Sequence, residues 1–154
     1  MKPVLFAAAL ILFSGAALAQ PSGAGQRRQQ FNSENGLALG GYDVVSYFAG
    51  KPRKGNAGFS YAYKGITYRF GSQATLDSFK KSPEKYEPAY GGWCAYAMGA
   101  SGEKVEIDPE TYKIVDGRLY VFYNRFFTNT LDKWNKDEAG LKKKADTSWM
   151  KFYH

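Results

Sequence analysis

The sequence predicts a small α+β domain, in which two antiparallel β-hairpins are packed by short helices and by a helical segment at the C-terminus. Two stretches alternate large apolar residues with small or polar ones on either side of a bend that contains glycine. Other stretches repeat apolar residues at helical spacing, most clearly toward the end of the chain. The length of 154 residues suits one domain with a single modest core.

The two hairpins are expected over residues 59–70 and 112–123. The first alternates on both arms and has Gly65 in the bend. The second bends at Asp116-Gly117, which is a strong turn signal because both central residues of a type I′ turn need a positive φ.

Short helices are expected between the hairpins. Asp43 can cap a turn of helix over residues 43–48, and residues 73–81 carry apolar side chains on one face. Ser82 followed by Pro83 is typical of a helix start.

Two further helical segments complete the predicted fold. One is expected over residues 93–99, and the longer one begins with Phe127, Leu131 and Trp134 on one face. Gly140 is expected to break or kink this segment. The same face continues through Leu141, Ala145, Trp149 and Phe152.

The N-terminal residues are typical of a secretory signal. An apolar run over residues 4–13 is too short to span a bilayer, and small residues precede a cleavage site expected after Ala19. The predicted organisation is a signal peptide over 1–19, a flexible polar leader over 20–35 and the domain over 36–154. The mature chain is therefore expected in the periplasm or outside the cell, with no transmembrane segment.

Charge and cysteine content limit the partners. Without Lys2 of the signal, 20 basic residues stand against 14 acidic ones, a balance that favours an acidic partner in the cell envelope. Nucleic acid is not expected in that compartment. Cys94 is the only cysteine, so an internal disulfide is excluded and the core has to depend on the aromatic residues, which number 12 Tyr, 11 Phe and 3 Trp in the full chain, with only Phe6 and Phe13 in the signal.

Enzyme signatures are scarce, and no enzymatic activity is expected. The only histidine is His154, the last residue, so Cys94 has no evident base. No glycine-rich phosphate loop or metalloprotease helix is present. An enzyme would need a cleft in which polar groups converge.

A soft-metal site is the sharper hypothesis. Cys94 and Met98 are four residues apart in a predicted helix, and a thiolate with a thioether suits copper in its Cu(I) state or another soft ion. A third ligand would come from Met150, His154 or a partner chain. The alternative is that both residues fill the core.

Two short motifs are further candidates for a ligand site. Asp43, next to Tyr42, can cap a helix, bond a tyrosine hydroxyl or contact a ligand. Tyr90 precedes Gly91 and Gly92, which can either present backbone N–H groups to an anion or permit a close crossing of chain segments.

Three sequence blocks resemble the secreted bacterial members of the YHS-domain family: GYDVVSYF at 41–48, KYEPAYGGWCA at 85–95 and DGRLYVFY at 116–123. The resemblance covers roughly residues 36–149. It implies a small α+β domain with a metal-related binding role, since some relatives are attached to copper-transporting ATPases and hold the ion with paired cysteines. This chain has one cysteine and lacks the family's histidine, so only Cys94 carries over as a candidate ligand.

Two interpretations of a binding domain outside the cytoplasm follow, and the family resemblance puts the metal-related domain first, with an interaction module as the alternative. A metal-related domain predicts an accessible, reactive Cys94. A non-catalytic interaction module for an acidic protein, a glycan or a membrane surface predicts a buried Cys94 and an exposed aromatic patch.

Overall fold

The α+β fold class is confirmed by a computed structural model that describes residues 23–152. The signal peptide expected over 1–19 lies outside these described residues. Of the helices in the described part, none has both the length and the apolar character that a membrane crossing requires.

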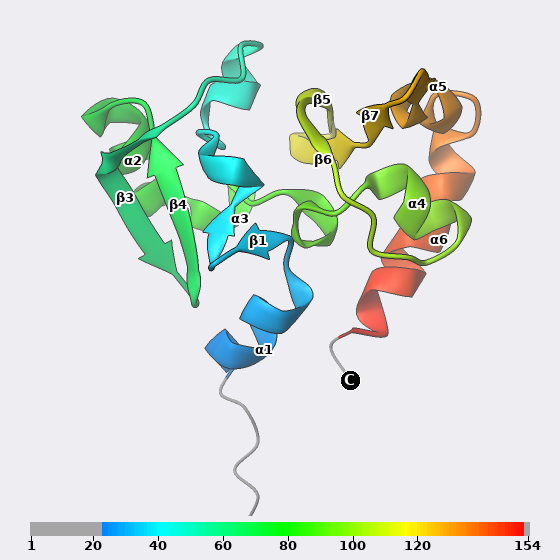
Figure 1. Cartoon of the computed structure of the whole chain (residues 1–154), viewed down its shortest axis with the longest axis horizontal. Coiled ribbons are helices and arrows are strands. Elements are labelled where there is room, and N and C mark those ends of the chain that lie inside the picture. The colour runs from blue at the N-terminus through cyan, green and yellow to red at the C-terminus, as the bar shows by residue number, and fades with distance from the viewer. Residues whose placement is uncertain (1–22, 153–154) are drawn as a thin grey trace, which may run out of the picture.

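One half of the molecule is built on a four-stranded sheet with the strand order β1-β2-β4-β3 (Figure 1). The pair β2–β4 is parallel, and the other two pairs are antiparallel. The strands are β1 (Ser33–Glu34), β2 (Leu37–Ala38), β3 (Asn56–Tyr63) and β4 (Ile66–Phe70). The helical elements of this half are η1 (Leu39–Gly41), η2 (Ser46–Ala49), α2 (Gln73–Lys81) and α3 (Pro83–Tyr86).

The other half combines two short hairpins with three helices, and η3 (Ala89–Gly92) leads into it from α3. The helices α4 and α6 pack closely, because Gly99 lets the α4 backbone approach that of Leu141 in α6. The elements are α4 (Ala95–Ala100), β5 (Asp108–Val115), β6 (Arg118–Phe122), β7 (Asn124–Arg125), β8 (Thr128–Asn129), α5 (Thr130–Trp134) and α6 (Glu138–Met150).

Both predicted hairpins are confirmed, with the bends where the sequence placed them. The strands β3 and β4 are joined by Lys64-Gly65, and β5 and β6 by Asp116-Gly117. All four bend residues have a positive φ, between 46° and 86°. Glycine and aspartate adopt this left-handed region at low cost, which favours the turns at three of the four positions, Lys64 being the exception.

The core consists of two hydrophobic clusters rather than one. Strand β6 separates them and is buried on both faces, since Leu119 and Val121 belong to the cluster that includes the sheet, whereas Tyr120 and Phe122 belong to the cluster around α4 and α6. The period of two in a strand therefore divides one run of apolar residues between two cores.

The flexible leader expected over residues 20–35 is instead ordered in its described part. Residues Gly23–Gln30 form α1, which is followed by β1. Arg27 forms an ion pair with Glu87, and Phe31 is buried edge-to-face against Trp149 at 5.9 Å between ring centroids. These contacts with distant parts of the chain hold a segment that has no apolar period of its own.

The C-terminal helical segment is also interrupted at a different place from the one predicted. The break falls between α5 and α6, where Asp137 caps the new helix by accepting a hydrogen bond from the Gly140 N–H at 3.1 Å. Gly140 thus lies in the first turn of α6 and does not kink it. Phe127 precedes α5 and does not share its buried face.

Candidate functional site

Cys94 is fully buried directly before α4. Its Sγ lies 3.4 Å from the Thr130 hydroxyl and 3.4 Å from the Tyr123 backbone nitrogen, whose N–H donates to the sulfur. The thiol therefore joins the end of β6 to the start of α5, and it is not accessible to a reagent in solution.

Met98 does not form a pair of exposed sulfur ligands with Cys94. Cys94 is the N-cap of α4 (φ −57°, ψ 115°), so it lies at the edge of the helix and not inside it. Cys94 packs in the cluster that includes the sheet and Met98 in the cluster around α4 and α6.

Further metal ligands are not gathered near these sulfurs. Within residues 23–152, no group of three His, Cys, Asp or Glu side chains could hold a metal ion. His154 lies outside the described residues, and Met150 is exposed at the end of α6.

Asp43 is a buried carboxylate that connects two elements of the sheet half. Its Oδ1 accepts a hydrogen bond from the Val45 N–H and its Oδ2 accepts one from the Gly71 N–H, both at 2.9 Å. The side chain is 1% exposed. Asp43 thereby fixes the turn leading to η2 against the loop that precedes α2.

A pocket of about 430 Å³ lies over Asp43, and Lys51, Arg53 and Lys54 line it together with the start of α2. We call it the basic pocket. All three cationic residues are exposed, and none of them belongs to an ion pair with another described residue. Like charges in one pocket repel each other, so an anion bound there would lower their electrostatic energy.

The remaining polar groups of the basic pocket are held by local hydrogen bonds. Ser72 caps α2 by accepting from the Thr75 N–H at 3.2 Å, and the Ser46 hydroxyl accepts from the Arg53 N–H at 2.9 Å. The loop backbone is therefore fixed, while its three cationic residues are exposed.

Tyr42 precedes Asp43 and contacts one cation of the basic pocket. The Lys54 ammonium lies 5.5 Å from the centre of the Tyr42 ring, a cation–π arrangement. The Tyr42 hydroxyl donates to Glu110 at 3.1 Å, and both burial and this carboxylate raise the pKa of Tyr42. Tyr42 therefore orients Lys54 and has no free anionic form at neutral pH.

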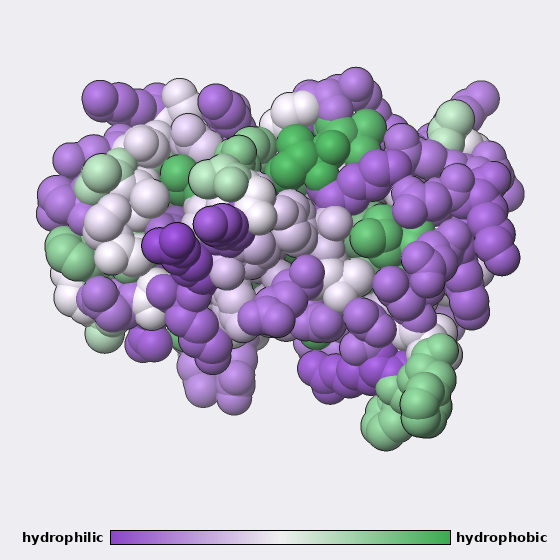
Figure 2. Space-filling view, turned by 90° about the horizontal axis from the view of Figure 1, so that it is seen from above, coloured by the Kyte–Doolittle hydropathy of each residue, from purple (hydrophilic) through white to green (hydrophobic). Residues whose placement is uncertain are grey.

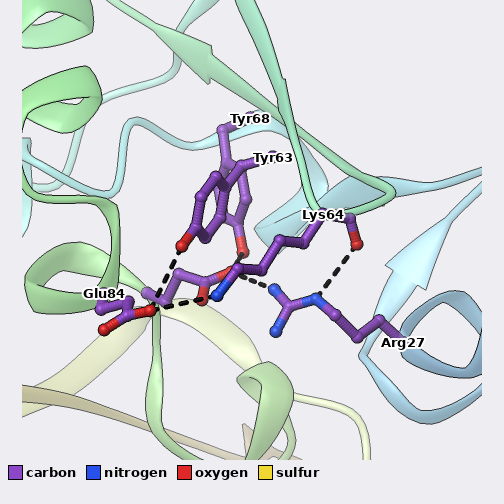
Figure 3. A network of polar contacts seen from close by, with 6 residues as sticks. Arg27, Tyr63, Lys64, Tyr68 and Glu84 are labelled. Atoms are coloured by element: carbon purple, nitrogen blue, oxygen red, sulfur yellow. Dashed lines mark hydrogen bonds and ion pairs between the residues drawn. The ribbon is translucent and has the colours of Figure 1, made fainter. Parts of the chain in front are cut away.

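Tyr90 lies beside a second pocket, of about 360 Å³, whose wall contains charges of both signs. Figure 3 shows the hydrogen bonds and ion pairs that connect these charged side chains. Arg27 pairs with Glu87, which also accepts the Tyr68 hydroxyl at 2.6 Å. Lys64 pairs with Glu84 at 3.1 Å. Arg118 also lines this pocket and is in no ion pair with a described residue, so two of its three cations are neutralised, whereas the three cations of the basic pocket share only the hydrogen-bonded carboxylate of Asp43. This second pocket therefore attracts an anion less strongly than the basic pocket does.

Gly91 and Gly92 serve a close crossing of chain segments. A Cβ atom at Gly91 would lie 2.7 Å from the Trp149 ring and 3.1 Å from Phe31. Asn32 donates hydrogen bonds to the carbonyls of both glycines, at 2.9 Å from its backbone to Gly91 and at 3.2 Å from its side chain to Gly92. The glycines thus present acceptors to the link between α1 and β1, and Gly91 leaves space that no other residue would leave.

Tyr90 adopts the left-handed region as well, with a φ of 53°. Its ring is buried, and its hydroxyl donates to Asp146 of α6 at 3.0 Å. Burial, followed by the nearby Asp146 charge, raises the pKa of Tyr90. The residue is therefore a buried connection between η3 and α6.

The most exposed aromatic residues were not anticipated as a site. Phe126 and Phe127 form the bend between β7 and β8, a pair that we call the Phe turn. They are 86% and 112% exposed, and their φ angles are 51° and 61°. Figure 2 shows a hydrophobic knob standing out among hydrophilic atoms on the side of the molecule where β7 and β8 lie. The available signal was the pair of adjacent phenylalanines between Arg125 and Thr128, but the helical spacing from Phe127 to Trp134 obscured it.

Comparison of the chain with protein-family models, with curated proteins and with solved structures finds no match. Membership of the YHS-domain family therefore stays a prediction from the three sequence blocks.

Proposed function

We propose that this protein is a non-catalytic interaction module that acts outside the cytoplasm and binds an anionic group of its partner in the basic pocket. The observation that carries the proposal is the group of three cationic residues, none in an ion pair with another residue of the described range 23–152, around a pocket of about 430 Å³. Excess positive charge over the whole mature chain would attract the same class of partner from a distance.

The surroundings of Cys94 favour this proposal over a copper or other soft-metal site. A thiol that binds a metal has to be reached by the ion. Cys94 is instead buried among apolar residues and hydrogen-bonded to Thr130. A buried cysteine with exposed aromatic residues is the combination expected of an interaction module.

The test uses the chain from Gln20 onward on a heparin column, because heparin is a soluble polyanion. The variant Lys51→Ala/Arg53→Ala/Lys54→Ala removes three charges from the basic pocket. The control Lys136→Ala/Lys143→Ala/Lys144→Ala removes the same number of exposed charges elsewhere. We expect the pocket variant to elute at clearly lower salt than the control, with unchanged thermal unfolding.

Equal shifts in elution for the two variants would mean that only net charge matters, and the proposed site would then be wrong. Saturable binding of Cu(I) that depends on Cys94 would restore the metal interpretation.

A further inference from the structure

The backbone of the Phe turn has a conformation that phenylalanine does not favour. The register Arg125↔Thr128 leaves only Phe126 and Phe127 in the bend, so both must take a positive φ. Bulky side chains are strained in the left-handed region, which glycine and asparagine adopt readily. Strain at an exposed position indicates that the two rings have a role outside the folding of the chain.

The rings are not covered by any described part of the protein. Their exposures of 86% and 112% are those of side chains projecting into solvent. Met150 is the one other large hydrophobic residue with high exposure among residues 23–152, and it lies at the end of α6, at the opposite end of the molecule from the β7–β8 hairpin (Figure 1). The Phe turn is thus an isolated apolar projection.

We infer that the Phe turn inserts into the interface of an anionic lipid bilayer. Two phenylalanine side chains provide about 300 to 500 Å² of buried area, whereas a stable protein interface needs about 800 Å² from each partner. In the part of the chain that the structure describes, the one other exposed large hydrophobic residue is Met150, which is too distant to supply the difference. A bilayer needs no such complementary surface, because the rings enter the acyl boundary while their polar neighbours stay at the headgroups.

The charges near the insertion point agree with an anionic lipid surface. Arg125 directly precedes the rings, and its guanidinium is held near the Ile107 carbonyl at 3.4 Å. The loop between η2 and β3, which carries Lys51, Arg53 and Lys54, reaches the same upper end of the molecule as the β7–β8 hairpin (Figure 1). Basic residues next to an anionic leaflet add to the affinity that apolar insertion provides.

This inference rests on the proposed function for its electrostatic part and names the anionic partner as a lipid surface. The Phe turn supplies the apolar part independently.

The experiment is flotation of the chain from Gln20 onward with vesicles of phosphatidylethanolamine and phosphatidylglycerol. The variant Phe126→Asn/Phe127→Gly keeps the tight turn, because these residues suit a positive φ. We expect its partition coefficient to fall at least about tenfold, in line with the loss of buried apolar area. The control Met150→Ser also removes an exposed apolar side chain and should stay within about twofold of the wild type.

A second measurement reports insertion directly. The variant Phe127→Trp should show an emission shifted to shorter wavelengths and quenching by brominated acyl chains, after subtraction of the wild-type spectrum. Vesicle binding that is equal in Phe126→Asn/Phe127→Gly and wild type would overturn the inference.

The two proposals fail separately. If the basic-pocket variant loses heparin and vesicle binding while the Phe-turn variant keeps vesicle binding, the proposed function stands and insertion is wrong. If the Phe-turn variant loses vesicle binding while the basic-pocket variant elutes from heparin with its charge-matched control, insertion stands and the basic pocket is not the anion site.

Discussion

The turns of β5–β6 and β7–β8 have similar backbones and opposite chemistry. The first has φ angles of 51° and 72° at Asp116 and Gly117, and the second has 51° and 61° at Phe126 and Phe127. Aspartate and glycine relieve the strain of this conformation, and phenylalanine does not. The comparison shows that the first turn is suited to forming the hairpin, whereas the second carries residues that stability alone would not select.

The largest expected effect separates a buried phenylalanine from an exposed one only four residues away. Phe122 is fully buried and packs edge-to-face on Trp134 at 5.6 Å between ring centroids. We expect Phe122→Ala to lower the free energy of unfolding by about 3 to 5 kcal/mol, and Phe126→Ala to leave it within about 0.5 kcal/mol. Urea unfolding followed by fluorescence measures both. A large loss in Phe126→Ala would show that its ring is packed and not free.

Transplanting the unfavourable residues should destabilise the other hairpin. Asp116→Phe/Gly117→Phe places two bulky residues at positive φ, which costs about 1 to 3 kcal/mol for each strained residue. The control Asp116→Asn keeps a turn-compatible residue and removes the exposed ion pair with Lys142, so it should cost less than about 1 kcal/mol. If the transplant is as stable as the control in urea unfolding, the turn conformation carries no strain.

The reverse exchange should stabilise the protein modestly. Phe126→Asn/Phe127→Gly relieves the left-handed strain at both residues, but the added glycine raises the entropy of the unfolded chain, so we expect the free energy of unfolding to rise by at least about 1 kcal/mol. The midpoint of urea unfolding measures this gain in the same variant that is expected to lose vesicle binding. A gain in stability together with a loss of binding would show that the two phenylalanines lower the free energy of unfolding and increase binding to vesicles.

The smallest effect concerns how β5–β6 is held against α6. Lys113 and the Trp134 indole both donate to Glu138, and the Lys113 hydrogen bond lowers the pKa of that carboxyl group. Because the pKa is lower in the folded state, Glu138 adds stability above its unfolded pKa of about 4.3, and this stability is lost as the pH falls through the folded value. We expect Glu138→Gln to reduce the loss of stability between pH 6 and pH 3 by less than about 1 kcal/mol. Identical pH dependence in both proteins, measured by urea unfolding, would contradict this role.

Local signals were sufficient to predict the two longer hairpins and α2. Asp116-Gly117 and Gly65 determine turns within a few residues, and alternation identifies the strands without knowledge of their partners. The order of α1 could not be predicted in this way, because it depends on Glu87 and Trp149, which are far along the chain.

The candidate site was less predictable, and for two physical reasons. The spacing of Cys94 and Met98 is helical, yet Cys94 is the N-cap of α4 and the two residues lie in different buried clusters, which spacing alone does not indicate. Phe127, Leu131 and Trp134 also match a helical period, but the ladder of β7 and β8 places the first of them in a turn.

The contact of Phe31 with Trp149 has a consequence for the order of folding. One ring lies just after α1, and the other lies on α6, near the end of the described chain. A chain that emerges from its N-terminus exposes Phe31 and the Gly91 backbone long before α6 exists to cover them. The contact between the first and last elements of the domain therefore forms last. A nascent chain halted before α6 would leave Phe31 and Gly91 exposed to proteases and chaperones.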